Sequence, residues 1–180
     1  MKFLEKEICL FFFPFQILKR GHDLPLQNRI KGKVPIYGSN GIVGYHNKST
    51  SDEAGVITGR SGTIGDVHYS KKSHWSLNTT LYVSNFHKNL PKFVYYYLYY
   101  FNLKNFSSGT GVPTLNRNDV HSVMISFPTK KIEQEKISDI LFNLDNLLME
   151  KKIIFVKTQF LKNSLQQDLL SERLNFSKLN

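Results

Sequence analysis

Apolar residues recur at alternating steps of three and four along residues 132–174. Lys151, Thr158 and Lys162 fill the remaining positions of this series. A repeat near 3.5 residues is typical of a coiled-coil seam, and neither Pro nor Gly interrupts the segment. The pattern predicts one continuous helix that pairs with another helix through a seam of Ile137, Leu141, Leu144, Leu148, Phe155, Leu165 and Leu169.

A second apolar register widens this stripe at seven-residue intervals, through Ile140, Leu147, Ile154 and Leu161. A helix over the whole segment would be roughly 60 Å long, whereas a typical globular helix has about 11 residues. Because a small domain cannot cover so long a stripe, we expect a second long helix, most simply from another copy of this chain. The alternative is a C-terminal helix that folds back on its own domain.

Residues 20–70 show a different pattern, in which short apolar runs alternate with turns. Nine of the 11 glycines lie in this stretch. The triplet Ser39-Asn40-Gly41 is typical of a turn, because Asn and Gly tolerate positive φ. The pattern predicts β-rich structure with exposed loops, and its strands are expected near 34–37, 42–43, 56–57 and 64–67.

The remaining apolar runs predict three further elements and allow two interpretations of the N-terminal segment. Residues 8–15 form a first strand or a helix end, with secretion as the alternative, although Pro14 interrupts the run. Pro91 opens a helix over 93–100, since Pro is favoured at the first helical position. We expect strands at 81–83 and 123–127, a turn at 116–119, a linker at 129–131 and the start of the long helix at Glu133.

The charge of the chain is concentrated before the long helix. The formal net charge is +10, and residues 1–129 hold 15 Lys and Arg against 7 Asp and Glu. Residues 130–180 hold 9 against 7. Such a field favours polyanions, most often nucleic acid. The alternative is a solvated basic protein without a polyanionic partner.

Several function classes lack their characteristic residues. The single cysteine, Cys9, excludes an internal disulfide and a cysteine-built zinc site, and favours a reducing compartment. The six histidines show no metal-binding spacing, and no nucleotide-binding Gly-Lys-Ser/Thr loop or Gly-x-Ser-x-Gly elbow is present. We expect a cytoplasmic, non-catalytic protein without metal, cofactor or membrane span.

Polar residues in the expected loops suit nucleic acid. An Arg side chain can bridge guanine with two hydrogen bonds, and Asn can do the same for adenine. Glycines let backbone amides approach phosphates closely. Each residue taken singly is also compatible with a structural role. The candidate DNA contacts are Arg60, Ser61, Thr63, Lys71, Lys72, His74 and Asn78.

Five motifs follow one another along the chain: KVPIYGSNGIVGY (33–45), ITGRSGTIG (57–65), WSLNTT (75–80), GTGVPTL (109–115) and FP (127–128) followed by IEQEKI (132–137). In this order they resemble the target-recognition domain of type I restriction–modification specificity subunits. The resemblance covers roughly residues 17–174. The matched motifs add Lys33, Ser39, Asn40 and Thr110 to the candidate DNA contacts.

The resemblance implies an α+β fold in two parts. Residues 1–130 would form a β-rich target-recognition domain with loops and a few helices, and residues 131–180 one long helix in an antiparallel coiled coil. Such subunits usually carry two domains and two helices, read a split target in double-stranded DNA, and recruit adenine-methylating modification subunits and restriction subunits. This chain resembles half a subunit, so a homodimer would restore the layout and read a palindromic site. The alternative function is a protein-interaction module oligomerised by a coiled coil.

Overall fold

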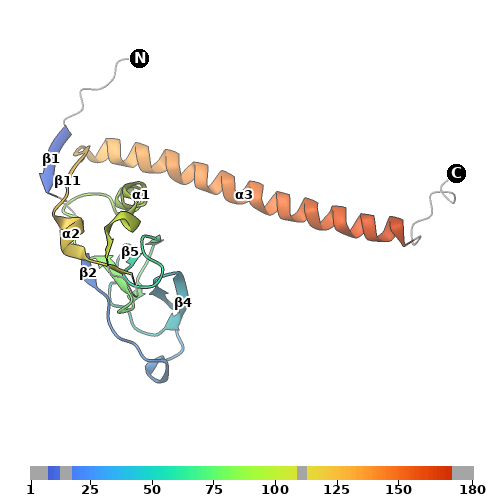
Figure 1. The fold of residues 1–180 in the computed structure, drawn as a ribbon, viewed down its shortest axis with the longest axis horizontal. Coiled ribbons are helices and arrows are strands. Elements are labelled where there is room, and N and C mark those ends of the chain that lie inside the picture. Colours follow the sequence, from blue (N-terminus) through green and yellow to red (C-terminus); the bar gives the residue numbers. More distant parts are fainter. Residues whose placement is uncertain (1–7, 13–17, 109–112, 172–180) are drawn as a thin grey trace, which may run out of the picture. The chain divides into compact units, whose positions relative to one another are not determined.

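The computed structural model describes residues 8–12, 18–108 and 113–171 of the 180-residue chain (Figure 1). The chain divides into two compact units, Met1–Ser138 and Asp139–Asn180. We call them unit 1 and unit 2 and describe each by itself. Candidate residue Thr110 lies outside the described residues.

The larger sheet of unit 1 has four strands in the order β2-β8-β5-β6. The strands are β2 (Leu18–Arg20), β8 (Thr80–Val83), β5 (Gly55–Gly59) and β6 (Val67–Ser70), and every neighbouring pair is antiparallel. All of β5 is buried, which fits a strand near the middle of the sheet.

A second sheet has three strands in the order β4-β3-β7. The strands β3 (Val34–Gly38) and β4 (Gly41–His46) form an antiparallel hairpin, and β7 (Trp75–Ser76) runs parallel to β3. The hairpin turns at Ser39 and Asn40, and Gly41 adopts a φ of 112°, as the turn signal predicted.

Two short two-stranded sheets and the helices complete the fold. Strand β1 (Ile8–Phe12) pairs with β11 (Met124–Pro128), and β9 (Ser107–Ser108) pairs with β10 (Thr114–Leu115). The helical elements are η1 (Leu26–Asn28), α1 (Pro91–Phe101), η2 (Leu103–Phe106), α2 (Arg117–His121) and α3 (Lys131–Leu170).

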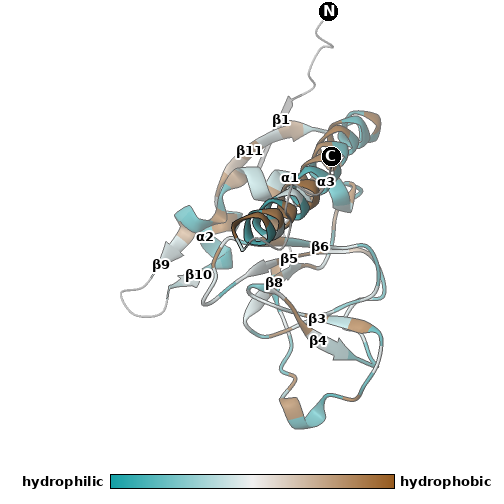
Figure 2. Cartoon of the chain, turned by 90° about the vertical axis from the view of Figure 1, so that its right-hand side faces the viewer, coloured by the Kyte–Doolittle hydropathy of each residue, from teal (hydrophilic) through white to brown (hydrophobic). Residues whose placement is uncertain are grey.

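The core of unit 1 lies between α1 and the four-stranded sheet. Figure 2 shows α1 over β5, β6 and β8, with β3 and β4 beyond them. Alternate residues of β5 and β6, such as Val56 and Val67, point toward the helix, and α1 contributes Phe93, Val94 and Leu98. Burying one such side chain contributes about 1.5–3 kcal/mol.

The first two turns of α3 belong to unit 1. Gln134 is 0% exposed, and its side-chain amide bonds to Leu90, Asn89 and Pro128. Ile137 is half-buried and packs against the core. The base of the long helix is therefore fixed by contacts within the same unit.

Most of the predicted elements are confirmed. Strands appear at each expected position, although β6 begins only at Val67 and leaves Ile64 in the preceding loop. Residues 8–12 form a strand rather than a helix end. The prediction of a β-rich part followed by one long helix is confirmed, while the partner helix stays a prediction.

Two local predictions were wrong. Residues 116–119 begin helix α2 instead of a plain turn, because the Asn116 side chain caps it by accepting a hydrogen bond from the Asn118 backbone N–H at 3.0 Å. The burial of Val120 then holds this short helix to the core. Helix α3 starts at Lys131, two residues before Glu133.

Candidate nucleic-acid interface

Three loops converge at the end of the strands where β3 and β5 finish. Gly59 at the end of β5 is packed so tightly that a Cβ there would lie 1.8 Å from the Thr63 carbonyl oxygen and 3.1 Å from that of Ser39. The Arg60 backbone N–H donates to the Thr79 carbonyl at 2.9 Å. The β3–β4 turn, the β5–β6 loop and the β7–β8 turn therefore lie together.

This convergence unites six of the candidate residues, which we call the turn-edge cluster: Ser39, Asn40, Arg60, Ser61, Thr63 and Asn78. Asn40 and Thr63 are exposed, and the others are half-buried. The Leu115 backbone N–H donates to the Arg60 carbonyl at 2.8 Å, which ties the loop to β10. Backbone contacts thus hold the loop in place while its polar side chains reach the surface.

One member of the cluster already has a partner within unit 1. The Asn78 side-chain amide donates to the Asp23 carboxylate. Asn78 therefore also links the β7–β8 turn to the segment after β2. The contact leaves its carbonyl oxygen as a possible acceptor, since an amide group offers both donors and an acceptor.

The candidate lysines lie at the opposite end of the strands. Gly55 pairs with Ser70, so Lys71 and Lys72 leave β6 where β5 begins. Lys72 lies shortly before β7, and Lys33 lies directly before β3. Because β3 runs parallel to β7, Lys33 lies at the same end of the strands as Lys72. All three side chains are exposed, and we call them the basic edge. The structure therefore splits the candidate residues into two groups.

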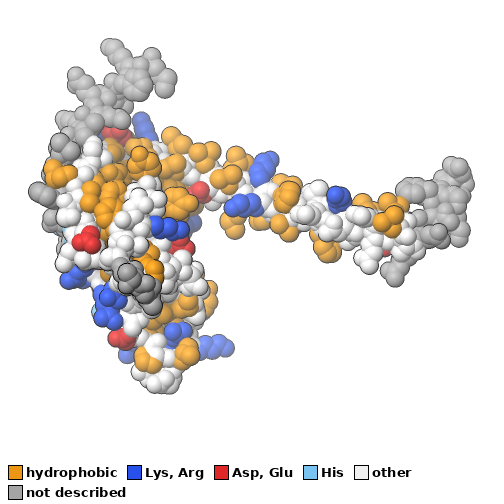
Figure 3. Space-filling model, in the orientation of Figure 1, with side chains coloured by type: hydrophobic (Ala, Val, Ile, Leu, Met, Phe, Trp, Pro, Cys, Tyr) orange, Lys and Arg blue, Asp and Glu red, His pale blue; other side chains and the backbone are white. Residues whose placement is uncertain are grey.

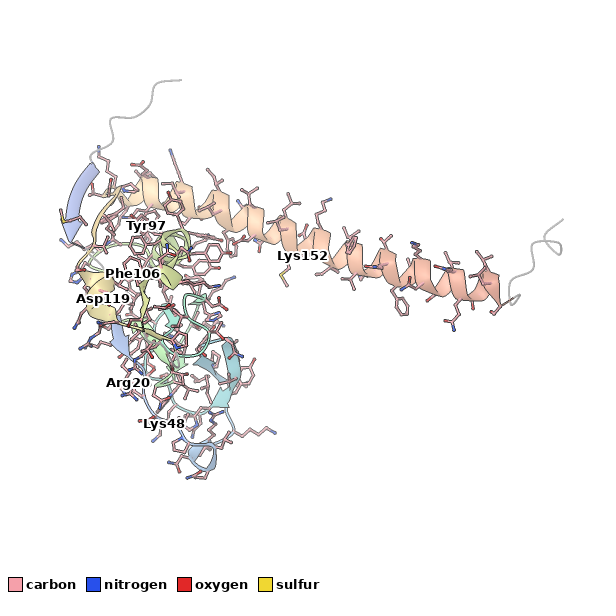
Figure 4. All side chains as sticks on the ribbon, in the orientation of Figure 1. Arg20, Lys48, Tyr97, Phe106, Asp119 and Lys152 are labelled. Carbon is pink, nitrogen blue, oxygen red and sulfur yellow. The ribbon has the colours of Figure 1, made fainter. Side chains whose placement is uncertain are left out.

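Sequence reasoning missed several cations of unit 1. Lys31 and Lys48 are exposed beside Lys33, and Arg20 is exposed on β2. Figure 4 labels Arg20 on β2 and Lys48 beyond β4, and Figure 3 shows Lys and Arg side chains over this part of unit 1. Lys31 and Lys48 could have been identified from the sequence, because they lie just outside the predicted hairpin.

His74 is a structural residue in this fold. It is 1% exposed, and its backbone exchanges hydrogen bonds with Ser51 at 2.9 and 3.2 Å. A Cβ on Gly55 would lie 2.1 Å from its ring, which shows how closely the ring is enclosed. Desolvation by burial lowers the pKa of His74, which favours a neutral ring. A ring so enclosed cannot reach a ligand at the surface. His74 is therefore buried beneath the basic edge.

The seam residues of α3 within unit 2 are exposed along its length. Leu161, Leu165 and Leu169 line an apolar groove of about 550 Å³ with Thr158, Lys162 and Gln166. Ile137, the first predicted seam residue, instead lies in unit 1 against the core. The exposed part of the seam therefore begins at Leu141.

A second exposed apolar stripe on α3 was not predicted. It follows steps of four, three and four through Met149, Ile153, Val156 and Phe160. With about 3.6 residues per turn, these positions fall on the side of the helix roughly opposite the seam. The sequence contains the signal for this stripe as well, since its apolar residues follow the same steps of three and four.

The described residues contain no group of three or more His, Cys, Asp or Glu side chains that could hold a metal ion. Among these residues, no helix combines the length and apolarity that crossing a bilayer requires.

A family model identifies the family of this chain. Residues 15–158 match the family model for the Type I restriction modification DNA specificity domain. An S subunit of a type I restriction-modification system from M. genitalium has a similar structure, with a TM-score of 0.66 at 18% identity over 95% of this chain and 48% of that chain. No curated protein matches.

Two further solved structures resemble the chain. One, from work on complex assembly and conformational transition of the type I R-M system, has a TM-score of 0.68 at 15% identity over 86% of this chain and 42% of that chain. The HsdS subunit from Thermoanaerobacter tengcongensis has a TM-score of 0.59 at 13% identity, over 83% and 40%. At these identities the likeness shows the fold, and the chain spans less than half the length of each of these three structures.

Proposed function

Because this chain belongs to the type I restriction modification DNA specificity family, we propose that it reads one half of a split target in double-stranded DNA. The observation that carries the proposal is the family match over residues 15–158, which includes the whole turn-edge cluster and the basic edge. The chain would act as a non-catalytic recognition component that guides other subunits to their site.

Unit 1 would supply both kinds of DNA contact. The turn-edge cluster offers Arg60 and Asn40, whose side chains match guanine and adenine edges. The basic edge and its neighbouring cations, Lys31 and Lys48, would bind phosphates. Phosphate contacts release counterions, so binding would weaken steeply as salt rises.

The exposed seam of α3 supports pairing with a second copy of the chain. Residues at steps of three and four from Leu141 to Leu169 would form an antiparallel coiled coil, with the apolar groove around Leu165 filled by the partner helix. A two-fold pair would place two copies of unit 1 on two half-sites. The site would then be palindromic with a fixed spacer.

The second stripe supports a further contact outside the homodimer. Met149, Ile153, Val156 and Phe160 would stay in water after the seam is paired, because they lie on the other side of the helix. We assign this stripe to the modification subunits, which would hold the methyl-transferring chemistry. Restriction subunits would join the same assembly.

A binding experiment on the full chain tests the proposal. Duplexes selected from a random pool are expected to converge on a split palindrome, and their affinity is expected to fall as salt rises. Replacing Lys71 and Lys72 by Gln should lower the slope of log affinity against log salt by about 0.9 for each lost phosphate contact, with the selected sequence unchanged.

Two results would contradict the proposal. Failure to bind duplex DNA at low salt would favour the protein-interaction alternative. Methyl transfer by the purified chain with S-adenosylmethionine would show a catalytic function that the proposal excludes.

A further inference from the structure

Strand β4 exposes apolar side chains at the edge of its sheet. It is an edge strand, since the sheet order is β4-β3-β7. Ile42, Val43 and Tyr45 on β4 are 51%, 41% and 56% exposed, and no charged residue lies between Gly41 and Tyr45. Exposed edge strands usually carry charges or Pro because a bare apolar edge invites aggregation. An apolar edge therefore calls for a partner that covers it.

A bulge shapes this edge. Ile36 pairs with Gly44 and Tyr37 pairs with Ile42, so Val43 is an extra residue in β4. Such an insertion bends the strand, increases its twist and redirects side chains. Here Ile42 and Val43 are both exposed, whereas regular alternation would turn one of them inward.

Cations surround the apolar edge. Lys31, Lys33 and Lys48 are exposed at the base of the hairpin, where a Cβ on Gly32 would lie 2.2 Å from the His46 carbonyl oxygen. The Arg29 guanidinium lies alongside β4, with Nη1 3.6 Å from where a Cβ on Gly44 would be. Of the acidic residues in the following loop, Asp52 accepts a hydrogen bond from the Ser49 hydroxyl.

Apolar residues framed by cations complement the major groove of DNA. The groove is about 12 Å wide and admits a two-stranded β-ribbon. Within it, the thymine methyl group is an apolar feature of the base edges, and phosphates line both sides. An acidic protein would match the lysines equally well, but the polar residues Ser39 and Asn40 in the turn of the same hairpin suit base edges and phosphates.

We infer that β4, the outer strand of the β3–β4 hairpin, faces the major groove and that Ile42, Val43 and Tyr45 select A·T pairs by contacting thymine methyl groups. The inference rests on the proposed function and makes it more specific. Lys31, Lys33 and Lys48 would contact the flanking phosphates, and the bulge at Val43 would set which base step the apolar side chains reach.

Replacing thymine by uracil tests this inference, because uracil lacks only the methyl group. Duplexes selected by the full chain would be resynthesised with deoxyuridine at each thymidine in turn. We expect the affinity to fall about fourfold for each contacted methyl group, the value of one buried methylene. In a doubly substituted chain, Ile42→Ser and Val43→Ser, the preference for thymidine over deoxyuridine should disappear at the positions that these two side chains contact and remain only where Tyr45 makes the contact.

Matched variants separate this effect from a loss of folding. Tyr45→Thr alone should lower the thymine preference in part, and Tyr100→Gln on α1 removes an exposed aromatic residue elsewhere and should preserve it. Melting temperatures of the variants should match that of the parent chain, since the substituted side chains are exposed.

Three results would overturn the inference. They are equal affinity of the parent chain for both kinds of duplex, a selected site without thymine, and a thymine preference that is undiminished in the double variant. DNA binding that is otherwise salt-dependent and sequence-specific would leave the proposed function standing. A double variant that bound DNA normally but lost a protein partner would assign the edge to that protein.

Discussion

The side-chain carbonyl oxygen of Gln134 accepts a hydrogen bond from the backbone N–H of Leu90, 44 residues earlier, at 3.0 Å. Leu90 precedes the first residue of α1, so this N–H has no partner within its own helix. The Gln134 amide nitrogen donates to the Pro128 carbonyl at 2.8 Å and to the Asn89 side chain at 2.7 Å. One buried amide therefore joins the start of α1, the end of β11 and the base of α3.

Replacing Gln134 by Met should destabilise unit 1. Met has a similar volume but cannot replace the three hydrogen bonds, and the Leu90 N–H and Pro128 carbonyl would lose their partner. We expect the free energy of unfolding to fall by roughly 2–4 kcal/mol, measured by urea denaturation. Gln159→Met, at an exposed position of α3, is the control and should unfold like the parent chain. An unchanged midpoint in Gln134→Met would show that water replaces these bonds.

Replacing Leu144 and Leu148 by Asp should separate the proposed homodimer. Two charges on the seam would be desolvated on pairing, which costs far more than the leucines contribute. We expect light scattering to give the mass of one chain, and affinity for a two-half site to fall toward that of a single half-site. Asn163→Asp, between the two stripes, should remain dimeric. A double variant with the mass of two chains would rule out the seam.

Substitutions on the second stripe should prevent binding of a modification subunit and leave the homodimer intact. Met149→Asp with Val156→Asp should leave the homodimer intact, because these residues lie away from the seam. The variant should fail to co-purify with a modification subunit from the same system, which the parent chain should bind. Retained binding of that subunit would place its docking surface elsewhere.

The stability of unit 1 should decrease in mild acid because of His74. Burial lowers its pKa in the folded chain, so the unfolded chain binds a proton more readily. Stability is then complete above the unfolded value of about 6.5 and is lost as the pH falls toward the folded pKa. His74→Gln should flatten the fall in melting temperature between pH 7 and pH 5. Gln159→Met, at an exposed position of α3, should leave the slope unchanged.

Local patterns in the sequence were sufficient for the elements of this fold. The seam of α3 follows one period for many turns, and Ser39-Asn40-Gly41 marks a hairpin through backbone preferences alone. Asn116 was assigned to a turn because an Asn that caps a helix and an Asn that ends a chain reversal look alike in sequence. The buried Val120 distinguishes them, and its burial depends on the rest of the fold.

The candidate site was predictable only in part, because it depends on pairings between distant segments. The parallel pairing of β3 with β7 and the contact of Gly59 with Ser39 decide which residues share an edge. As a result, Arg60 lies beside Ser39, and Lys71 lies at the other end of the strands. The burial of His74 has the same origin, since the chain from Thr50 to Gly55 encloses it.

The two opposed stripes of α3 have a consequence for how this protein can be produced. In the proposed assembly, a second copy of the chain covers the seam, while the second stripe stays exposed until a modification subunit binds it. Exposed apolar surfaces of this kind are the ones that chaperones retain and proteases remove. The amount of usable protein in a cell would then follow the supply of its assembly partners rather than its own rate of translation. For the same reason, co-expression with those partners should yield far more material than expression of the single chain.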